Sequence, residues 1–134
     1  MHTLSKRERL KSTALMDLAF AKGVRMKQYP LMGRAIQTAL PHDVPFQAAF
    51  SVGKKRFRRA VDRNRIKRLL REAWRLEKSR LAKNWEPGAP QWAVVFIFVG
   101  TEIPTFSECQ GLMALAVERL EKARRDAGDR QTNP

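Results

Sequence analysis

Residues 50–72 read F-S-V-G-K-K-R-F-R-R-A-V-D-R-N-R-I-K-R-L-L-R-E. Nine of the fifteen residues from Lys54 to Arg68 are lysine or arginine, and Asp62 is the single acid among them. Apolar residues alternate before this run, and a helical period begins near Val61. The stretch therefore predicts a strand, a basic connection and the start of a long helix.

That helix, expected from near Val61 to near Lys83, has a cationic face. At 100° per residue, the basic residues within roughly 100° of arc around Asn64 are Lys67, Arg68, Arg71, Arg75 and Lys78. The apolar residues expected on the opposite side are Ile66, Leu69, Ala73 and Leu76, with Leu70 flanking them. Glu72 and Glu77 lie off the basic face, whereas an ordinary exposed helix intersperses acids for pairing. A solvated face is the usual explanation of a charge run, but this one-sided stripe favours contact with nucleic acid, because arginine suits both phosphates and bases.

The overall composition favours the same kind of partner. The chain has 134 residues, with 27 lysines and arginines against 13 acids, which gives a net charge of +14. Nucleic acid and an anionic membrane are the two obvious partners for such an excess. The longest apolar run, Trp92 to Val99, is far shorter than the roughly 20 residues that span a bilayer, and no secretory signal is visible. Cys109 is the one cysteine, so we expect no internal disulfide and a reducing, cytoplasmic location.

Cap and turn signals divide the rest of the chain. A short helix is expected between Ser12 as its N-cap and Gly23 as its stop. Residues 24–40 predict one or two strands, the P-H-D-V-P sequence at 41–45 a turn, and the alternation of 46–52 a further strand.

Similar signals follow the long helix. A loop at 84–90 and a continuously apolar strand at 92–99, buried on both faces, are expected. A capping box formed by Thr105 with Glu108, or by Ser107 with Gln110, would then start a last helix.

These elements define an α+β fold in which a single sheet packs against helices. The expected order is α-β-β-(β)-α-β-α, and the long basic helix is a crossover between strands 46–52 and 92–99. The general rule makes such a crossover right-handed. Residues 1–125 are expected to form a single RNA-binding domain and residues 126–134 a disordered tail.

Aromatic side chains offer a second candidate surface. Phe20, Tyr29, Phe46 and Phe50 are able in principle to stack on single-stranded bases. Strand spacing favours core positions for Phe46 and Phe50 and leaves both possibilities open for Phe20 and Tyr29.

Residues suited to catalysis are sparse. His2 and His42 are the only histidines, no Cys/His pair has metal-ligand spacing, and the carboxylates are scattered. Cys109 is expected to be a small core residue. We therefore expect no protein-bound cofactor or metal, and if the molecule takes part in a reaction, the catalyst is expected to be its partner.

The stretch at 50–72 resembles the signature of the bacterial ribonuclease P protein family, in which a strand ending in S-V-S-K-K leads to A-V-x-R-N-R-x-K-R-x-x-R-E. The R-L-K at 9–11 and the F-x-x-G at 20–23 resemble the opening of that family. Four residues depart from the family pattern. Gly53 stands where the family commonly has serine, Arg58 and Arg59 replace its usual Gly-Asn pair, and Met16 stands where an aromatic residue is common.

The resemblance implies an RNA-binding subunit that joins a catalytic RNA in removing the 5′ leader of precursor tRNA, with Mg²⁺ held mainly by RNA. Neither a membrane nor a protein partner is expected. The resemblance also implies a left-handed crossover, opposite to the general rule. The residues then expected to face the catalytic RNA are Arg63, Asn64, Arg65, Lys67, Arg68 and Arg71, with Arg75 on the same stripe. Those expected to line a cleft for the leader are Phe20, Ser51 and Lys54, with Lys55 beside them.

Other functions remain open on the residues alone. A structural ribosomal protein, with no linked reaction, shares this composition. A metal-dependent nuclease would need a carboxylate cluster that is not evident. DNA binding is less favoured, because no helix-turn-helix or zinc-finger spacing appears.

Overall fold

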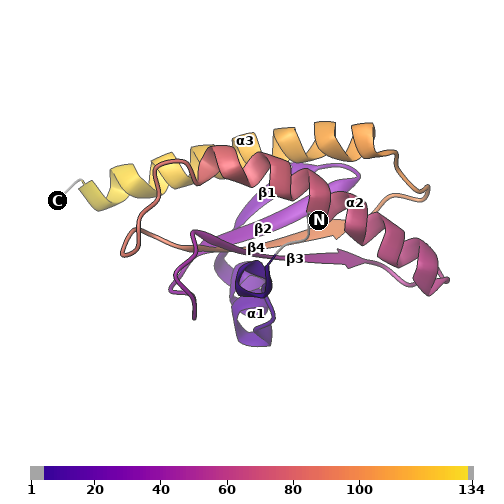
Figure 1. Cartoon of the computed structure of the whole chain (residues 1–134), viewed down its shortest axis with the longest axis horizontal. Coiled ribbons are helices and arrows are strands. Elements are labelled where there is room, and N and C mark those ends of the chain that lie inside the picture. Colours follow the sequence, from indigo (N-terminus) through magenta and orange to yellow (C-terminus); the bar gives the residue numbers. More distant parts are fainter. Residues whose placement is uncertain (1–4, 133–134) are drawn as a thin grey trace.

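The computed structural model describes residues 5–132, with side chains described for residues 5–127. The elements, in chain order, are η1 (Lys6–Glu8), α1 (Thr13–Lys22), β1 (Val24–Gln28), β2 (Leu31–Gln37), β3 (Phe46–Val52), α2 (Ala60–Leu81), β4 (Trp92–Phe98) and α3 (Phe106–Thr132). The strands form one sheet in the order β1-β2-β4-β3 (Figure 1). The predicted α+β class and element order are confirmed.

The strand β4 is the centre of the sheet. It pairs antiparallel with β2 and parallel with β3, so that Phe50 lies opposite Phe96. Parallel neighbours need a long connection, and α2 supplies it by crossing one face of the sheet. The crossover itself is confirmed, whereas its hand stays a prediction.

Alternate residues of β4 are buried on opposite faces of the sheet. Trp92, Val94, Phe96 and Phe98 belong to the core beneath α2 and α3. Ala93 and Val95 belong to a smaller cluster beneath α1. Figure 1 shows this layering, with α2 and α3 on one side of the sheet and α1 on the other. The prediction of a strand buried on both faces is confirmed.

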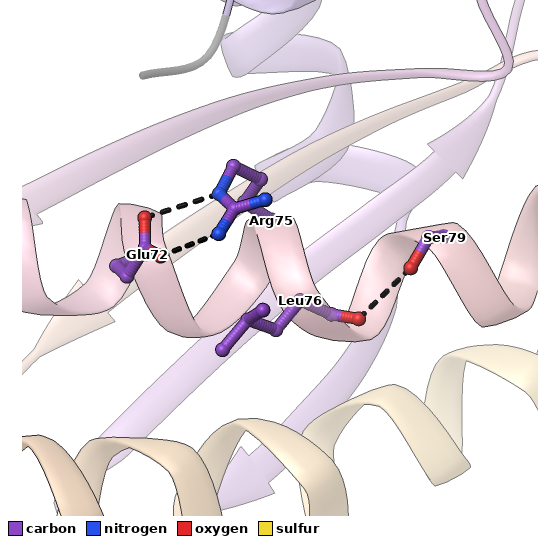
Figure 2. Close-up of polar contacts among 4 residues, drawn as sticks. All are labelled: Glu72, Arg75, Leu76 and Ser79. Atoms are coloured by element: carbon purple, nitrogen blue, oxygen red, sulfur yellow. Dashed lines mark hydrogen bonds and ion pairs between the residues drawn. The ribbon is translucent and has the colours of Figure 1, made fainter. Parts of the chain in front are cut away.

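The buried side of α2 differs in part from the predicted one. Its buried residues are Ile66, Leu70, Ala73, Trp74 and Leu81. Leu76, predicted to be buried, is 40% exposed. The reason is that the large side chain of Trp74 is buried in the core, with its ring 5.5 Å from Phe46 and 5.4 Å from Phe96. This contact turns the buried sector toward Leu70 and Trp74, and Arg75 and Leu76 project from different sides of α2 (Figure 2).

The predicted caps of α1 and α3 are present. The Ser12 hydroxyl accepts a hydrogen bond from the backbone of Leu15, and α1 ends before Gly23. At α3 the structure selects Thr105 with Glu108: the Thr105 hydroxyl accepts from the Glu108 N–H at 3.1 Å, and the Glu108 carboxylate accepts from the Thr105 N–H at 3.4 Å.

The helix α3 is longer than predicted. It continues to Thr132, past the predicted domain end at residue 125, and residues 133–134 lie outside the described residues. Ala123 and Ala127 explain the difference, because both are partly buried against the core four residues apart on one face of the helix. The division of the chain at residue 125 stays a prediction.

The N-terminal segment is held against the edge of β3. The Gln47 amide donates to the Arg7 carbonyl at 2.8 Å, and the Leu10 N–H donates to the Ala48 carbonyl at 3.0 Å. These bonds place Arg9, which forms a bridge with Ala48, beside β3.

Gly23 is required for close packing rather than for a left-handed backbone, because its φ is −75°. A Cβ atom there would lie 2.3 Å from the Ala19 carbonyl oxygen and 2.7 Å from that of Ala35.

We expect Gly23→Ala to lower the free energy of unfolding by about 1–3 kcal/mol in urea titrations. Gly111→Ala is the control, because a Cβ meets nothing within 4 Å there, and an added helical alanine should stabilise by about 0.5–1 kcal/mol. Equal effects of the two substitutions would contradict this assignment.

Candidate RNA interface

The first half of α2 has a cluster of cations that is not paired with any acid of residues 5–127. Asn64, Arg65 and Arg68 are exposed, and Lys67 and Arg71 are half-buried. Among the described side chains, none of these four cations forms an ion pair. The predicted cationic face is therefore present here and open to solvent.

Arg71 lies where positive charges meet. Burial lowers the pKa of its guanidinium, and the neighbouring charges of Arg9 and Arg68 lower it further. Arginine keeps its proton in this setting, so the shift records an unfavourable concentration of positive charge. Arg9, from the segment beside β3, thus joins the surface; the basic residues that surround it near the N-terminus were the available signal in the sequence.

The second half of the stripe is paired with acids of the same chain. Arg75 forms a bidentate contact with the Glu72 carboxylate: its Nη2 donates to Oε1 at 2.6 Å and its Nε donates to Oε2 at 3.1 Å. Figure 2 shows both bonds. This hydrogen-bonded contact raises the pKa of Arg75. Lys78 pairs with Glu8 of η1. The stripe predicted around Asn64 is thus divided, and Arg75 differs from Arg65 and Arg68 in having an internal partner.

The end of the stripe shows ordinary helical bonding. The Ser79 hydroxyl donates to the Leu76 carbonyl at 3.0 Å within α2 (Figure 2). Such a bond satisfies the side chain locally.

Arg63 supports the basic connection that precedes α2. Its guanidinium donates at 2.8 Å to the carbonyl oxygens of Phe57 and Arg58. Arg56 donates to the Val99 carbonyl at 2.6 Å and ties the same connection to the end of β4. Arg63, predicted as an RNA contact, therefore lies against its own loop, where it positions the start of α2.

The opposite face of the sheet has a groove beside α1. It has a volume of about 320 Å³, and Phe20, Met32 and Ile97 line it. Phe20 is 41% exposed. Ser51 is exposed and pairs with Ile97 in the sheet register, so Phe20 and Ser51 lie on the same side of the sheet.

Cations missed by the sequence interpretation also line this groove. They are Arg25, Lys27 and Arg34. Arg25 and Arg34 are direct partners in the sheet, an arrangement that repulsion disfavours. Arg34 also lies over the Phe20 ring at 5.9 Å and donates to the Phe20 carbonyl at 3.1 Å. The alternation of Arg25 and Lys27 around buried Met26 was the available signal.

The remaining predicted residues lie between or away from these surfaces. Lys54 and Lys55 are exposed in the connection between β3 and α2. Phe50 is partly buried, and its ring stacks on that of Phe96 with 5.7 Å between the centroids, while Phe46 is buried. The predicted core positions of Phe50 and Phe46 are therefore confirmed. Tyr29 is 63% exposed and lines a different groove, so it does not join Phe20.

Two absences hold for the residues that the structure describes. Within 5–127, no three His, Cys, Asp or Glu side chains gather as a metal site. Within 5–132, no helix combines the length and apolarity needed to cross a membrane. Cys109 is fully buried, which confirms its predicted place in the core.

An uncovered cationic helix and a cationic, aromatic groove on one α+β sheet define a nucleic-acid-binding protein. The family model described as Ribonuclease P matches residues 4–121. The ribonuclease P protein component of Porphyromonas gingivalis is 37% identical over 119 residues, which cover 87% of this chain and 85% of the relative. That of Chlorobaculum tepidum is 40% identical over 87 residues, covering 61% of this chain and 55% of the relative.

A solved structure agrees in fold. The ribonuclease P protein of Staphylococcus aureus superimposes with a TM-score of 0.68 at 22% identity, covering 86% of this chain and 96% of that one. The chain belongs to the ribonuclease P protein family, whose members are the accessory protein component of an endoribonuclease.

The thiol of Cys109 should be unreactive in the native protein. Burial, with a contribution from Glu108, raises its pKa to about 11 from an ordinary value of 9.0. At pH 9.0 an accessible thiol is half ionised, whereas Cys109 should hold about one per cent thiolate. We expect iodoacetamide at this pH to alkylate Cys109 slowly in native buffer and rapidly in urea. The alkylation rate is measured by mass spectrometry. Equal rates would show that Cys109 is accessible.

Proposed function

We propose that the open half of the α2 stripe binds the RNA subunit of ribonuclease P. The observation that carries this proposal is the cluster of Arg65, Lys67, Arg68 and Arg71 beside Arg9, in which none of the four α2 cations forms an ion pair with a described side chain. Phosphates would replace the missing acids, and Asn64, exposed among them, would contact a base edge or a ribose hydroxyl. Arg75 would contribute only by exchanging Glu72 for a phosphate, and Arg63 would act by holding the connection in place.

We further propose that the groove beside α1 binds the 5′ leader of precursor tRNA. Phe20 offers an exposed ring for stacking, while Arg25, Lys27 and Arg34 offer cations to the phosphates. Ser51 with Lys54 and Lys55 would continue the path around the end of β3 toward the start of α2. In this proposal residues 1–125 act as one RNA-binding domain.

The chemistry in this proposal belongs to the RNA partner. The protein would lower the repulsion between two RNAs and orient the leader, while Mg²⁺ held mainly by RNA would activate the attacking water. The protein side chains would thereby favour substrate binding rather than donate a catalytic group. The reducing cytoplasm, suggested by a single buried cysteine, is the location that we propose.

Removing one exposed cation should weaken RNA binding without unfolding the protein. We expect Arg65→Ala or Arg68→Ala to lower affinity for the catalytic RNA by about tenfold and to reduce the slope of log K against log salt by roughly 0.7–0.9. Arg63→Ala should instead lower the free energy of unfolding by about 1 kcal/mol, because it loses its bonds to the connection. Arg119→Ala, an exposed position on α3, is the matched control for charge.

Filter binding across a salt series and urea titration separate these effects. Normal RNA affinity with reduced stability in the Arg65 and Arg68 variants would show that this face is structural, and the proposal would fail.

The linked reaction is tested by reconstitution with the catalytic RNA. At low Mg²⁺ the protein should increase cleavage of precursor tRNA with a long leader, mainly through a lower KM, because its cations support substrate binding. The gain should shrink when the leader is shortened or when Phe20→Ala is used. Unchanged cleavage would favour an RNA-binding protein with no linked reaction, and cleavage by protein without RNA would indicate a nuclease.

A further inference from the structure

A second cationic pocket lies at the far end of α2. It has a volume of about 420 Å³ and is formed by the end of α2, the loop before β4, the start of β4, the end of β2 and residues 121–125 of α3. Figure 1 shows the end of α2 beside the later part of α3, at the side of the molecule away from the start of α2. Asn64 and Leu81 are separated by roughly 26 Å along the helix. The pocket is therefore distinct from the open half of the stripe.

The pocket has more cations than acids. Arg80, Lys83, Arg124 and Arg125 line it, against Glu121. Arg125 approaches Glu121 only to 3.7 Å and is 67% exposed, so this pair contributes little. Lys83 is exposed and forms no ion pair with any described side chain. Cations thus remain available to a ligand.

Arg124 holds a guanidinium at the base of the pocket. It donates to the Leu81 carbonyl at 2.9 Å and lies 5.2 Å over the Phe46 ring. Burial lowers the pKa of this group, although Glu121 opposes the shift. A fixed and partly desolvated cation is stabilised by an anion placed beside it.

An indole ring completes the pocket. The Trp85 Nε1–H donates to the Pro90 carbonyl at 2.9 Å, which holds the half-buried ring in the pocket wall. Gln37 and Asn84 also line the pocket and offer amide groups. A fixed aromatic ring, adjacent cations and amides together suit a nucleotide better than an inorganic anion, because the ring adds a stacking partner for a base.

We propose that this pocket binds an unpaired ribonucleotide of an RNA, with its base against Trp85 and its phosphate on Lys83 and Arg125. The inference rests on the proposed RNA-binding function and adds a second point of contact to it. Two anchors at opposite ends of α2 would fix the orientation of an RNA along the helix, whereas one anchor leaves it free to rotate.

Tryptophan fluorescence of the full chain is the direct test. Trp74 is 1% exposed and Trp92, which also lines the pocket, is 4% exposed, so half-buried Trp85 offers a ligand the largest accessible indole surface of the three. A short oligouridylate should quench the emission saturably and less effectively as salt increases. Trp85→Leu should remove the quenching. An oligoglutamate of equal charge should quench little, and equal quenching by that peptide would overturn the assignment to RNA.

Charge variants test the phosphate contacts. Lys83→Ala with Arg125→Ala should weaken oligouridylate binding by about tenfold. The control is Arg119→Ala with Lys122→Ala, which removes the same charge at exposed positions outside the pocket and should change binding by less than about twofold. Equal losses in the two double variants would overturn the proposal.

Holoenzymes reconstituted with these variants distinguish the source of the nucleotide. Weaker binding of the catalytic RNA assigns the nucleotide to that RNA, and a higher KM for precursor tRNA assigns it to the substrate. If the Lys83, Arg125 variant matches its control in both measurements while protein-stimulated cleavage is intact, this inference fails and the proposed function stands. If the unaltered protein gives no stimulation, the proposed function itself fails.

Discussion

The parallel pairing of β3 with β4 is the constraint on which the rest of the molecule depends. Parallel neighbours cannot be joined by a tight turn, so the chain must cross a face of the sheet between Val52 and Trp92, and α2 is that crossing. Since β4 is buried on both faces, α2 has to give Trp74 and its apolar neighbours to the core. Its other side is thereby left for cations. The same topology places the basic connection at the end of β3, between the two faces of the sheet.

Acids of the same chain pair with the cations in only one part of α2, so the uncompensated positive charge is concentrated in the other part. Glu72 and Glu8 pair with Arg75 and Lys78, whereas Arg71 faces further positive charge. Repulsion of this kind reduces the stability of the free protein, and a polyanion removes it. The opposition of Arg25 and Arg34 on the other face has the same character. Both surfaces thus have excess positive charge in the free chain, which suits an RNA-binding accessory component of an endoribonuclease.

The sequence predicted those features that depend on neighbours in the chain. Alternation located β3, the Ser12 and Thr105 caps located two helix starts, and helical spacing located the open half of the stripe. It did not predict features set by packing between distant segments. The burial of Trp74, the pairing of Lys78 with Glu8 and the approach of Arg9 to Arg71 all depend on how α2 lies on the sheet. The groove cations Arg25 and Arg34 come together only through strand pairing, and the bonds of Arg63 to the preceding loop leave no periodic signal. The assignment of Arg63 to RNA came from the family resemblance and stays a prediction.

Chemical footprinting of arginines tests the central claim most directly. The complete chain would be treated with phenylglyoxal, alone and in complex with the catalytic RNA, and each arginine followed by mass spectrometry. The account predicts that Arg65 and Arg68 lose reactivity in the complex while Arg119 on α3 keeps it. Undiminished reactivity of Arg65 and Arg68 in a saturated complex would show that RNA does not cover the start of α2, and would contradict the account.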